Sequence, residues 1–273
     1  MLTRSSAHVH TPYCDGKSDA AHMAETACKL GFFSLGFSSH ACQPFDPEYS
    51  MSPEYENAYR QEILALKDQY QGRLAIHLGI ERDYYSTSSA AHYEYFIASC
   101  HYFLKPEGFY AVDGPPEKIT QYVERYCAND GIQFAKDYFD LLQSYVLSVR
   151  PPIVGHMDLI RKNNQLLHLF DEQSPAYQKM ALDCLSALRE TNAILEVNTG
   201  AMARGYLSTP YPAAFLLKAW HEMKGSVMLN SDCHDARFLA FGYDEAEALL
   251  RSCGFTAALR LGRHSLFEEY SLI

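Results

Sequence analysis

Histidine and acidic residues recur at the ends of β-like segments along the whole chain, and this pattern restricts the possible folds more than any other feature. They are, in order, His8, His10, Asp15, His40, Glu81, His101, His156, Asp232 and His234. Alternate residues of an extended segment point to the same side, so His8 and His10 can bind one ion from a single strand end. Imidazoles and carboxylates without a thiolate suit Zn, Mn or Fe. The set therefore indicates a metallohydrolase.

Short β-rich runs alternate with helical patterns throughout the sequence. The expected strands cover residues 5–10, 34–38, 74–80, 94–99, 152–156, 193–198 and 226–230. The expected helices cover residues 19–30, 53–71, 116–128, 133–149, 174–190, 211–223 and 243–253. Alternation of this kind implies parallel βαβ units in an α/β protein.

A closed barrel explains the positions of the proposed ligands better than an open sheet does. Each of the following lies at or just after the carboxyl end of an expected strand: His10, His40, Glu81, His101, His156 and Asp232. In a barrel these ends form one rim, so residues far apart in sequence converge there, whereas an open sheet spreads them along a line. The 273 residues fit one such domain. Segment 102–151 is longer than one crossover needs, and we expect it to be an insertion over the rim.

Composition and charge exclude several classes of partner. The formal net charge is −10, and the sequence has no Lys/Arg stripe, which argues against binding to nucleic acid or to an anionic membrane. The eight cysteines are scattered and form no C-x-x-C pair, so we expect free thiols in a reducing compartment. No signal-like core and no apolar run of ~20 residues is present. These features predict a cytoplasmic protein.

The residues around the proposed ligands form six short motifs, which read HVHTPYCDG, SSH, GIE, SCH, GHMD and SDCH. In this order they resemble the motifs of the polymerase and histidinol phosphatase (PHP) family of phosphoesterases. Within the family, the chain is most similar to the stand-alone histidinol-phosphate phosphatases, because of the long segment after ASCHYF and the runs GHMDLIRK and EVNTGAMARG. The resemblance implies a distorted, TIM-like (β/α)7 barrel with a cluster of usually three metal ions at the carboxyl-terminal rim of the strands.

The resemblance also implies how the ligands share three divalent ions, which would be Zn, Fe or Mn. It gives the first ion to His8, His10, Glu81 and Asp232, the second to Glu81, His101 and His156, and the third to Asp15, His40 and His234. Glu81 would then bridge the first two ions. Some relatives have a histidine at the position of Asp15, so the acidic residue here would alter the charge or the metal preference.

Phosphoester hydrolysis follows from this ligand set. Metal coordination lowers the pKa of water from ~16 toward ~7, so that a bridging hydroxide can attack phosphorus in line. The resemblance assigns phosphate binding to Arg161 and Arg204, since the planar guanidinium binds phosphate oxygens bidentately. Surface ion pairs are the alternative for both arginines. Lys162 could help to bind the phosphate, but it is expected to be a solvated neighbour. Asp232, His234 or a metal-bound water could protonate the leaving alkoxide.

The other histidines are expected to be structural. They are His22, His77, His92, His168, His221 and His264. Cys100 and Cys233 each flank a proposed ligand, and alternation along an extended segment predicts that they pack into the wall instead.

Together these observations predict a phosphomonoesterase that converts L-histidinol phosphate to L-histidinol and phosphate in histidine biosynthesis. The main alternative is a PHP-family phosphoesterase for other small phosphate esters or nucleotides. A metal-binding regulatory protein and a polymerase-associated exonuclease are weaker hypotheses, because the ligand set is intact and no basic groove is evident. Acidic side chains of segment 102–151 are candidates for binding the substrate ammonium, and the oligomeric state stays open.

Overall fold

The computed structural model describes residues 4–273. Its strands are β1 (Ser5–Ser6), β2 (Ser34–Phe37), β3 (Ala75–Asp83), β4 (Tyr95–Ser99), β5 (Tyr102–Lys105), β6 (Gly108–Ala111), β7 (Ile153–Val154), β8 (Ile194–Asn198), β9 (Val227–Asn230), β10 (Ala257–Leu261) and β11 (Phe267–Ser271). Its α-helices are α1 (Ala20–Lys29), α2 (Pro53–Gln69), α3 (Pro116–Tyr126), α4 (Gly131–Val149), α5 (Asn164–Leu167), α6 (Pro175–Arg189), α7 (Gly200–Ala203), α8 (Ala214–Glu222) and α9 (Tyr243–Ser252). Short 3₁₀ turns cover Ala90–His92, Leu159–Arg161 and Ala236–Phe238. Every strand and helix expected from the alternation is present, and the strand ladders at β1 and β7 are shorter than expected.

Nine strands form one sheet in the order β1-β2-β3-β4-β7-β8-β9-β10-β11. All neighbouring pairs from β1 to β10 are parallel, and β11 pairs antiparallel with β10. The inner strands are buried on both faces, as β8 is along its whole length. Helices cover the outer face, and strand side chains that include Ile97, Ile153, Ile194 and Met228 pack together on the other. The molecule is therefore an α/β protein with a mostly parallel sheet, as the alternation predicts.

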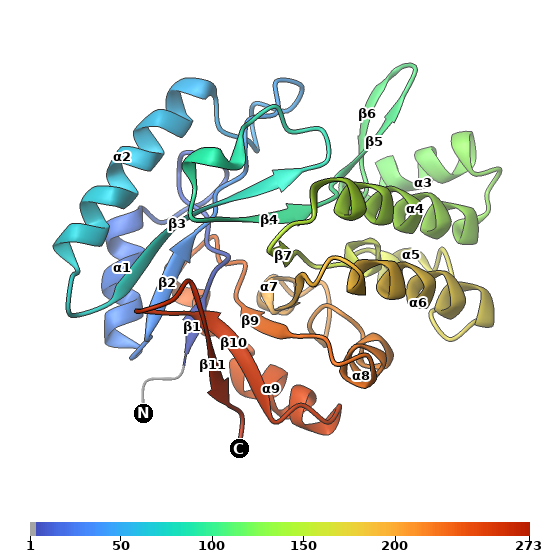
Figure 1. Cartoon of the computed structure of the whole chain (residues 1–273). Coiled ribbons are helices and arrows are strands. Elements are labelled where there is room, and N and C mark those ends of the chain that lie inside the picture. Colours follow the sequence, from blue (N-terminus) through green and yellow to red (C-terminus); the bar gives the residue numbers. More distant parts are fainter. Residues whose placement is uncertain (1–3) are drawn as a thin grey trace.

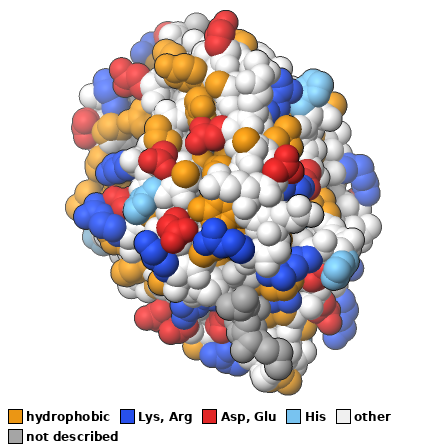
Figure 2. All heavy atoms as spheres, turned by 90° about the vertical axis from the view of Figure 1, so that its left-hand side faces the viewer, with side chains coloured by type: hydrophobic (Ala, Val, Ile, Leu, Met, Phe, Trp, Pro, Cys, Tyr) orange, Lys and Arg blue, Asp and Glu red, His pale blue; other side chains and the backbone are white. Residues whose placement is uncertain are grey.

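The helices lie outside the strands, with α1 and α2 along one side and α4 and α6 packed together on the other (Figure 1). Several begin at a side chain that caps the free backbone amides. Asp19 accepts from the amide of His22, and Ser52 accepts from the amide of Tyr55 just before Pro53. On the side that carries α1 and α2, acidic and basic side chains are interspersed over the surface (Figure 2).

Segment 102–151 differs in part from expectation. Its two helices form as α3 and α4, but it begins with the antiparallel hairpin β5–β6, which the sequence reading did not predict. The ring of Phe109 in β6 stacks on Phe45, with ring centroids 3.5 Å apart. This contact fixes the hairpin against the loop that follows β2.

The carboxyl ends of the parallel strands continue as extended chain toward a common region. A single parallel bridge joins Val9 to Cys233, and another joins His40 to Glu81. The amide of His10 also donates to the carbonyl of Cys233 at 2.9 Å. These pairings bring the segments after β1, β2, β3 and β9 together, although only Ser5 and Ser6 of the expected first strand form a ladder.

Two expectations about the chain as a whole can be compared with the structure. All eight cysteines are free thiols. Across residues 4–273, no helix combines the length and the apolar character that crossing a bilayer requires.

Candidate metal centre

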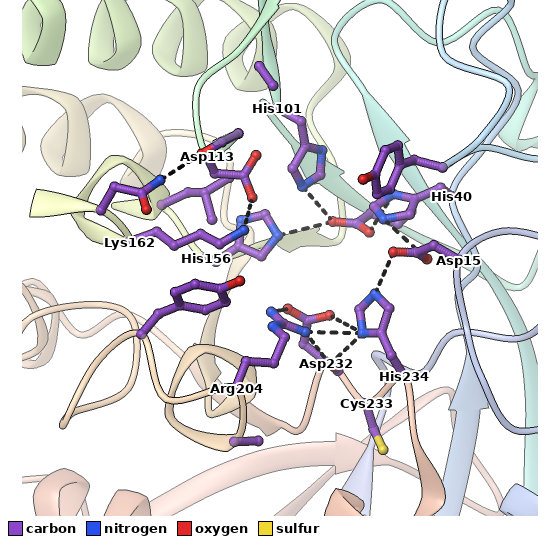
Figure 3. Close-up of a pocket in the computed structure, with 18 of the residues that line it drawn as sticks. Asp15, His40, His101, Asp113, His156, Lys162, Arg204, Asp232, Cys233 and His234 are labelled. Atoms are coloured by element: carbon purple, nitrogen blue, oxygen red, sulfur yellow. Dashed lines mark hydrogen bonds and ion pairs between the residues drawn. The ribbon is translucent and has the colours of Figure 1, made fainter. Parts of the chain in front are cut away.

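All nine side chains proposed as metal ligands meet at the carboxyl ends of the parallel strands. They fall into four overlapping groups, within each of which the ligand atoms lie within 4.8 Å of one another. The groups are His10, Asp15, His40 and His234; His8, Glu81 and His156; His8, His10 and Asp232; and His40, Glu81 and His101. Figure 3 shows several of them pointing into one pocket. Residues from six separate strand ends thus form one cluster.

Glu81 in β3 lies at the centre of the cluster. Its Oε1 is 3.1 Å from Nε2 of His156 and 3.5 Å from Nε2 of His101. Its Oε2 is 3.1 Å from Nε2 of His8 and 3.0 Å from Nδ1 of His40. Oε2 also lies 3.5 Å from Nε2 of His10. The two carboxylate oxygens therefore face different sets of histidines, which is the geometry that a bridging ligand needs.

Asp15 organises the outer part of the cluster. Its Oδ2 lies 3.0 Å from Nε2 of His234, and its Oδ1 lies 3.9 Å from Nε2 of His40. The rings of His10 and His234 stack with centroids 4.0 Å apart. The turn containing Asp15 thus places its carboxylate beside two histidines that come from β2 and β9.

Asp232 reaches the cluster from an unusual backbone conformation. Its φ is 47°, in the left-handed region, which aspartate tolerates better than most residues. Oδ1 of Asp232 lies 3.3 Å from Nε2 of His10, and Oδ2 accepts from Nη2 of Arg204 at 3.0 Å. A Cβ at Gly200 would lie 2.8 Å from that Oδ2, so only glycine allows this approach.

The electrostatics of the cluster fit divalent cations. Among residues 4–273, several buried polar atoms there find no hydrogen-bond partner, including Nε2 of His8, Nε2 of His10 and Oε2 of Glu81. Such atoms are costly unless a cation or another group satisfies them. Burial together with the nearby His234 and His40 rings lowers the pKa of His10 to about 3. The imidazole is therefore neutral at neutral pH, the form that can bind a metal ion. Burial acts to raise the pKa of Glu81, but the surrounding histidines hold it well below its usual range.

The two arginines expected at the phosphate differ in position. Arg204 lines the pocket, and its Nη1 lies 3.1 Å from Nδ1 of His234. Arg161 does not line it, because its side chain is buried and bonded to Glu172 at 2.7 Å and Asp158 at 3.1 Å. A phosphate-binding role for Arg161 is therefore not supported by this geometry.

Lys162, the residue after Arg161, lines the pocket. Residues three apart in a 3₁₀ turn share a side, so Arg161 faces Asp158 and the next residue is turned toward the pocket. Nζ of Lys162 lies 2.7 Å from Oδ2 of Asp113 and 4.8 Å from the ring centre of Tyr206. The expectation that Lys162 is merely a solvated neighbour is wrong, since its side chain is largely buried in the pocket wall.

The pocket above the cluster has a volume of about 900 Å³. Its wall includes Tyr102, Asp113 and Pro115 from segment 102–151, so this insertion contributes to the site. Burial acts to raise the pKa of Asp113, but Lys162 and His101 lower it to about 2. Asp113 thus presents a charged carboxylate to the pocket.

The remaining histidines lie apart from the cluster. Within the described residues none of the six joins a potential metal-binding group. His77, for example, is buried and lies with Nε2 2.8 Å from the carbonyl oxygen of Gly262. The side chain of Cys233 points away from the pocket, as alternation predicts, and Cys100 is buried (Figure 3).

Two buried carboxylates beside the ligands were missed by the sequence reading. Oε1 of Glu196 lies 2.7 Å from Nδ1 of His8, and Oδ2 of Asp83 lies 3.4 Å from Nδ1 of His101. Glu196 sits in the middle of an apolar strand, and that misplaced charge was the signal that could have revealed it.

Comparison with known proteins bears on the family of the chain. A model of the PHP domain matches residues 6–200. The chain is 26% identical to the histidinol-phosphatase of Bacillus subtilis (strain 168), over 92% of this chain and all of that protein. A structure of histidinol phosphate phosphatase from Lactococcus lactis, solved with zinc, L-histidinol and phosphate, superposes with a TM-score of 0.72 at 18% identity, covering 95% of this chain and 97% of that one. The structure of a putative histidinol phosphatase from Listeria monocytogenes superposes with a TM-score of 0.78 at 19% identity, covering 89% of this chain and 99% of that one. The chain belongs to the PHP domain family.

Proposed function

We propose that the chain is a metal-dependent phosphomonoesterase that hydrolyses L-histidinol phosphate to L-histidinol and phosphate. The observation that carries the proposal is the cluster centred on Glu81, whose two oxygens face separate sets of histidines beneath a pocket lined by Arg204 and Lys162. The Bacillus subtilis relative, matched along its entire length, is a histidinol-phosphatase. The same chemistry on this chain would serve histidine biosynthesis.

Three divalent ions are proposed for the cluster. His8, His10, Glu81 and Asp232 would hold the first, Glu81, His101 and His156 the second, and Asp15, His40 and His234 the third. The donor set of imidazoles and carboxylates suits Zn, Fe or Mn. Bound there, such ions would supply activated water and positive charge for the phosphoryl oxygens. Asp232 and His234 remain the proposed proton donors for the leaving alkoxide.

Arg204 and Lys162 are the proposed donors to the phosphate. Both line the pocket, and each is held by a carboxylate, Asp232 for Arg204 and Asp113 for Lys162. These contacts orient the two cations before substrate arrives, and pre-oriented charge is what phosphoryl transfer requires. Lys162 replaces Arg161 in this role.

Asp113 is the proposed partner of the substrate ammonium. It is the acidic residue of segment 102–151 that lines the pocket, and its low pKa keeps it charged at neutral pH. The substrate ammonium would bind the Asp113 carboxylate beside Lys162, and the Lys162 ammonium would contact the substrate phosphate. The ion pair between Asp113 and Lys162 would thus recognise both ends of the substrate.

A closed barrel is proposed for the sheet, with the chain forming a single PHP-type domain. The bridge between Val9 and Cys233 supports closure, because it joins the segment after β1 to the segment after β9. Segment 102–151 would be an insertion over the carboxyl-terminal rim. The free thiols of the chain fit a cytoplasmic location.

The test is phosphate release from L-histidinol phosphate against a panel of other phosphomonoesters and nucleotides, with metal content measured on the same sample. We expect about three ions per chain and a strong preference in kcat/KM for L-histidinol phosphate. A metal-loaded protein that prefers another ester would support the alternative of a PHP phosphoesterase with a different substrate. A protein that binds metal but hydrolyses none of them would favour a regulatory role.

A further inference from the structure

The carboxylate of Glu196 in β8 is fully buried behind the metal centre and accepts four hydrogen bonds. Oε1 lies 2.7 Å from Nδ1 of His8 and 3.0 Å from Nδ2 of Asn230. Oε2 lies 2.7 Å from the backbone amide of His156 and 3.0 Å from Nδ2 of Asn198. A buried charge of this kind is retained only with such complete hydrogen bonding.

The bond to His8 fixes which ring nitrogen carries the proton. A carboxylate at 2.7 Å is an acceptor, so Nδ1 of His8 must be the donor. Nε2 lies on the cluster side of the ring, 3.1 Å from Oε2 of Glu81, and with the proton held on Nδ1 it is the nitrogen that would offer its lone pair to a bound ion. Glu196 thereby sets both the tautomer and the orientation that a metal ligand requires.

The second oxygen holds the chain at His156. That residue follows the two-residue strand β7, so its backbone has little ladder pairing of its own. Gly155 allows β7 to pass close to β4, since a Cβ there would lie 2.5 Å from Oγ of Ser99. The bond from the His156 amide therefore ties the position of a second proposed ligand to the same carboxylate.

We propose that Glu196 is a positioning residue that orients His8, through its ring, and His156, through its backbone, toward the metal cluster. The inference rests on the ligand assignment made for the proposed function. An amide could not replace the carboxylate, because all four partners are donors. In Glu196→Gln one end of the side chain would present its own NH₂ to donors, either to the ring of His8 or to the amide of His156.

The test compares zinc binding by wild type, Glu196→Gln and Glu94→Gln. Glu94 is a matched control, because it also contacts a histidine nitrogen and accepts from a backbone amide, but it lies before β4 at the far end of the strands. We expect Glu196→Gln to bind one zinc ion about 10- to 100-fold more weakly in competition with a chromophoric chelator, as outer partners of metal-bound histidines typically do when replaced. Glu94→Gln should titrate like wild type.

Two further readouts separate positioning from general damage. At saturating zinc, kcat of Glu196→Gln should recover to within a few-fold of wild type, because the ligands themselves are intact. In the unaltered zinc-loaded protein, proton–nitrogen NMR should show a slowly exchanging Nδ1–H on His8. This second readout needs no variant, so a failure of Glu196→Gln to fold would not remove the test.

Each outcome decides one point. Equal zinc affinity for Glu196→Gln and wild type, or a His8 ring in the zinc-loaded wild-type protein that is protonated on Nε2, would overturn the role of Glu196. Wild-type protein that binds no zinc would instead overturn the ligand assignment. Normal zinc binding without turnover of L-histidinol phosphate would leave Glu196 in place and reject only the substrate.

Discussion

Oε1 of Glu81 lies 3.1 Å from Nε2 of His156, while the other oxygen of the same carboxylate lies 3.1 Å from Nε2 of His8. The two histidines come from the ends of β7 and β1, which are not neighbours in the sheet. One buried side chain therefore connects ligands on separate strands. Its removal should affect two proposed ion sites at once.

Glu81→Ala is expected to lose two ions together and to reduce kcat/KM by at least about 100-fold, since both sites lose a charged ligand. Elemental analysis of the purified variant would give the metal count per chain. Glu94→Ala, which removes a carboxylate far from the cluster, should keep the full count. Loss of one ion alone, or of none, would contradict the bridging role.

Replacing Lys162 should reduce activity, whereas replacing Arg161 should reduce stability. Lys162→Met removes a cation from the pocket wall, and we expect kcat/KM to fall about 10- to 100-fold with little change in stability. Arg161→Met leaves the buried Asp158 without its partner, which should reduce the free energy of unfolding by about 3–5 kcal/mol. Kinetics and urea unfolding on both variants would separate the two roles, and the reverse pattern would restore Arg161 as the phosphate ligand.

Asp113→Asn should weaken recognition of the substrate ammonium. A charged hydrogen bond of this kind contributes about 1.5–3 kcal/mol, so kcat/KM for L-histidinol phosphate should fall by about 10- to 100-fold. An analogue that lacks the amino group serves as the control, because it makes no such contact. If the variant lost equal activity on both compounds, Asp113 would act through Lys162 rather than on the ammonium.

The convergence of the proposed ligands could be predicted, because each of them lies at or near the carboxyl end of an expected strand. Parallel strands align their carboxyl ends, so His40, His101 and His156 had to approach one another once the strands were recognised. Which of Arg161 and Lys162 lines the pocket could not be predicted, because it depends on the direction in which a single 3₁₀ turn points each side chain.

Other features depended on contacts between distant segments. The hairpin β5–β6 is stabilised by Phe109 stacking on Phe45, a contact between residues 64 positions apart that no local pattern reveals. Glu196 looked like one polar residue in an apolar strand until its partners from β1, β7 and β9 were in view. Sequence periodicity finds the residues at strand ends, but it does not find the buried groups that hold them.

Removal of metal should destabilise the fold as well as abolish activity. The cluster leaves buried polar atoms such as Nε2 of His8 and Oε2 of Glu81 without hydrogen-bond partners, and cations would satisfy them. A ligand that binds only the native state adds about 2.7 kcal/mol at a free concentration 100 times its Kd. We expect chelation to lower Tm by several degrees and zinc to restore both Tm and activity. An unchanged Tm after complete chelation would contradict a buried metal centre.

The acid stability of the protein should depend in part on Glu94. Burial acts to raise its pKa, but His77, the amide of Leu78 and Lys67 lower it from 4.5 to about 2. Because the pKa is depressed in the folded state, the carboxylate stabilises the fold above about pH 4.5, and this contribution is lost as the pH falls toward 2.

Glu94→Gln lacks this contribution at every pH. The difference in unfolding free energy between wild type and Glu94→Gln should therefore be constant above about pH 5 and shrink by about 1–2 kcal/mol toward pH 2, a value reduced for partial solvent exposure. Urea unfolding of metal-free protein at pH 7, 4 and 3 measures it, with the exposed Glu124→Gln as control. A difference that stays flat across this range would show that Glu94 has an ordinary pKa in the folded protein.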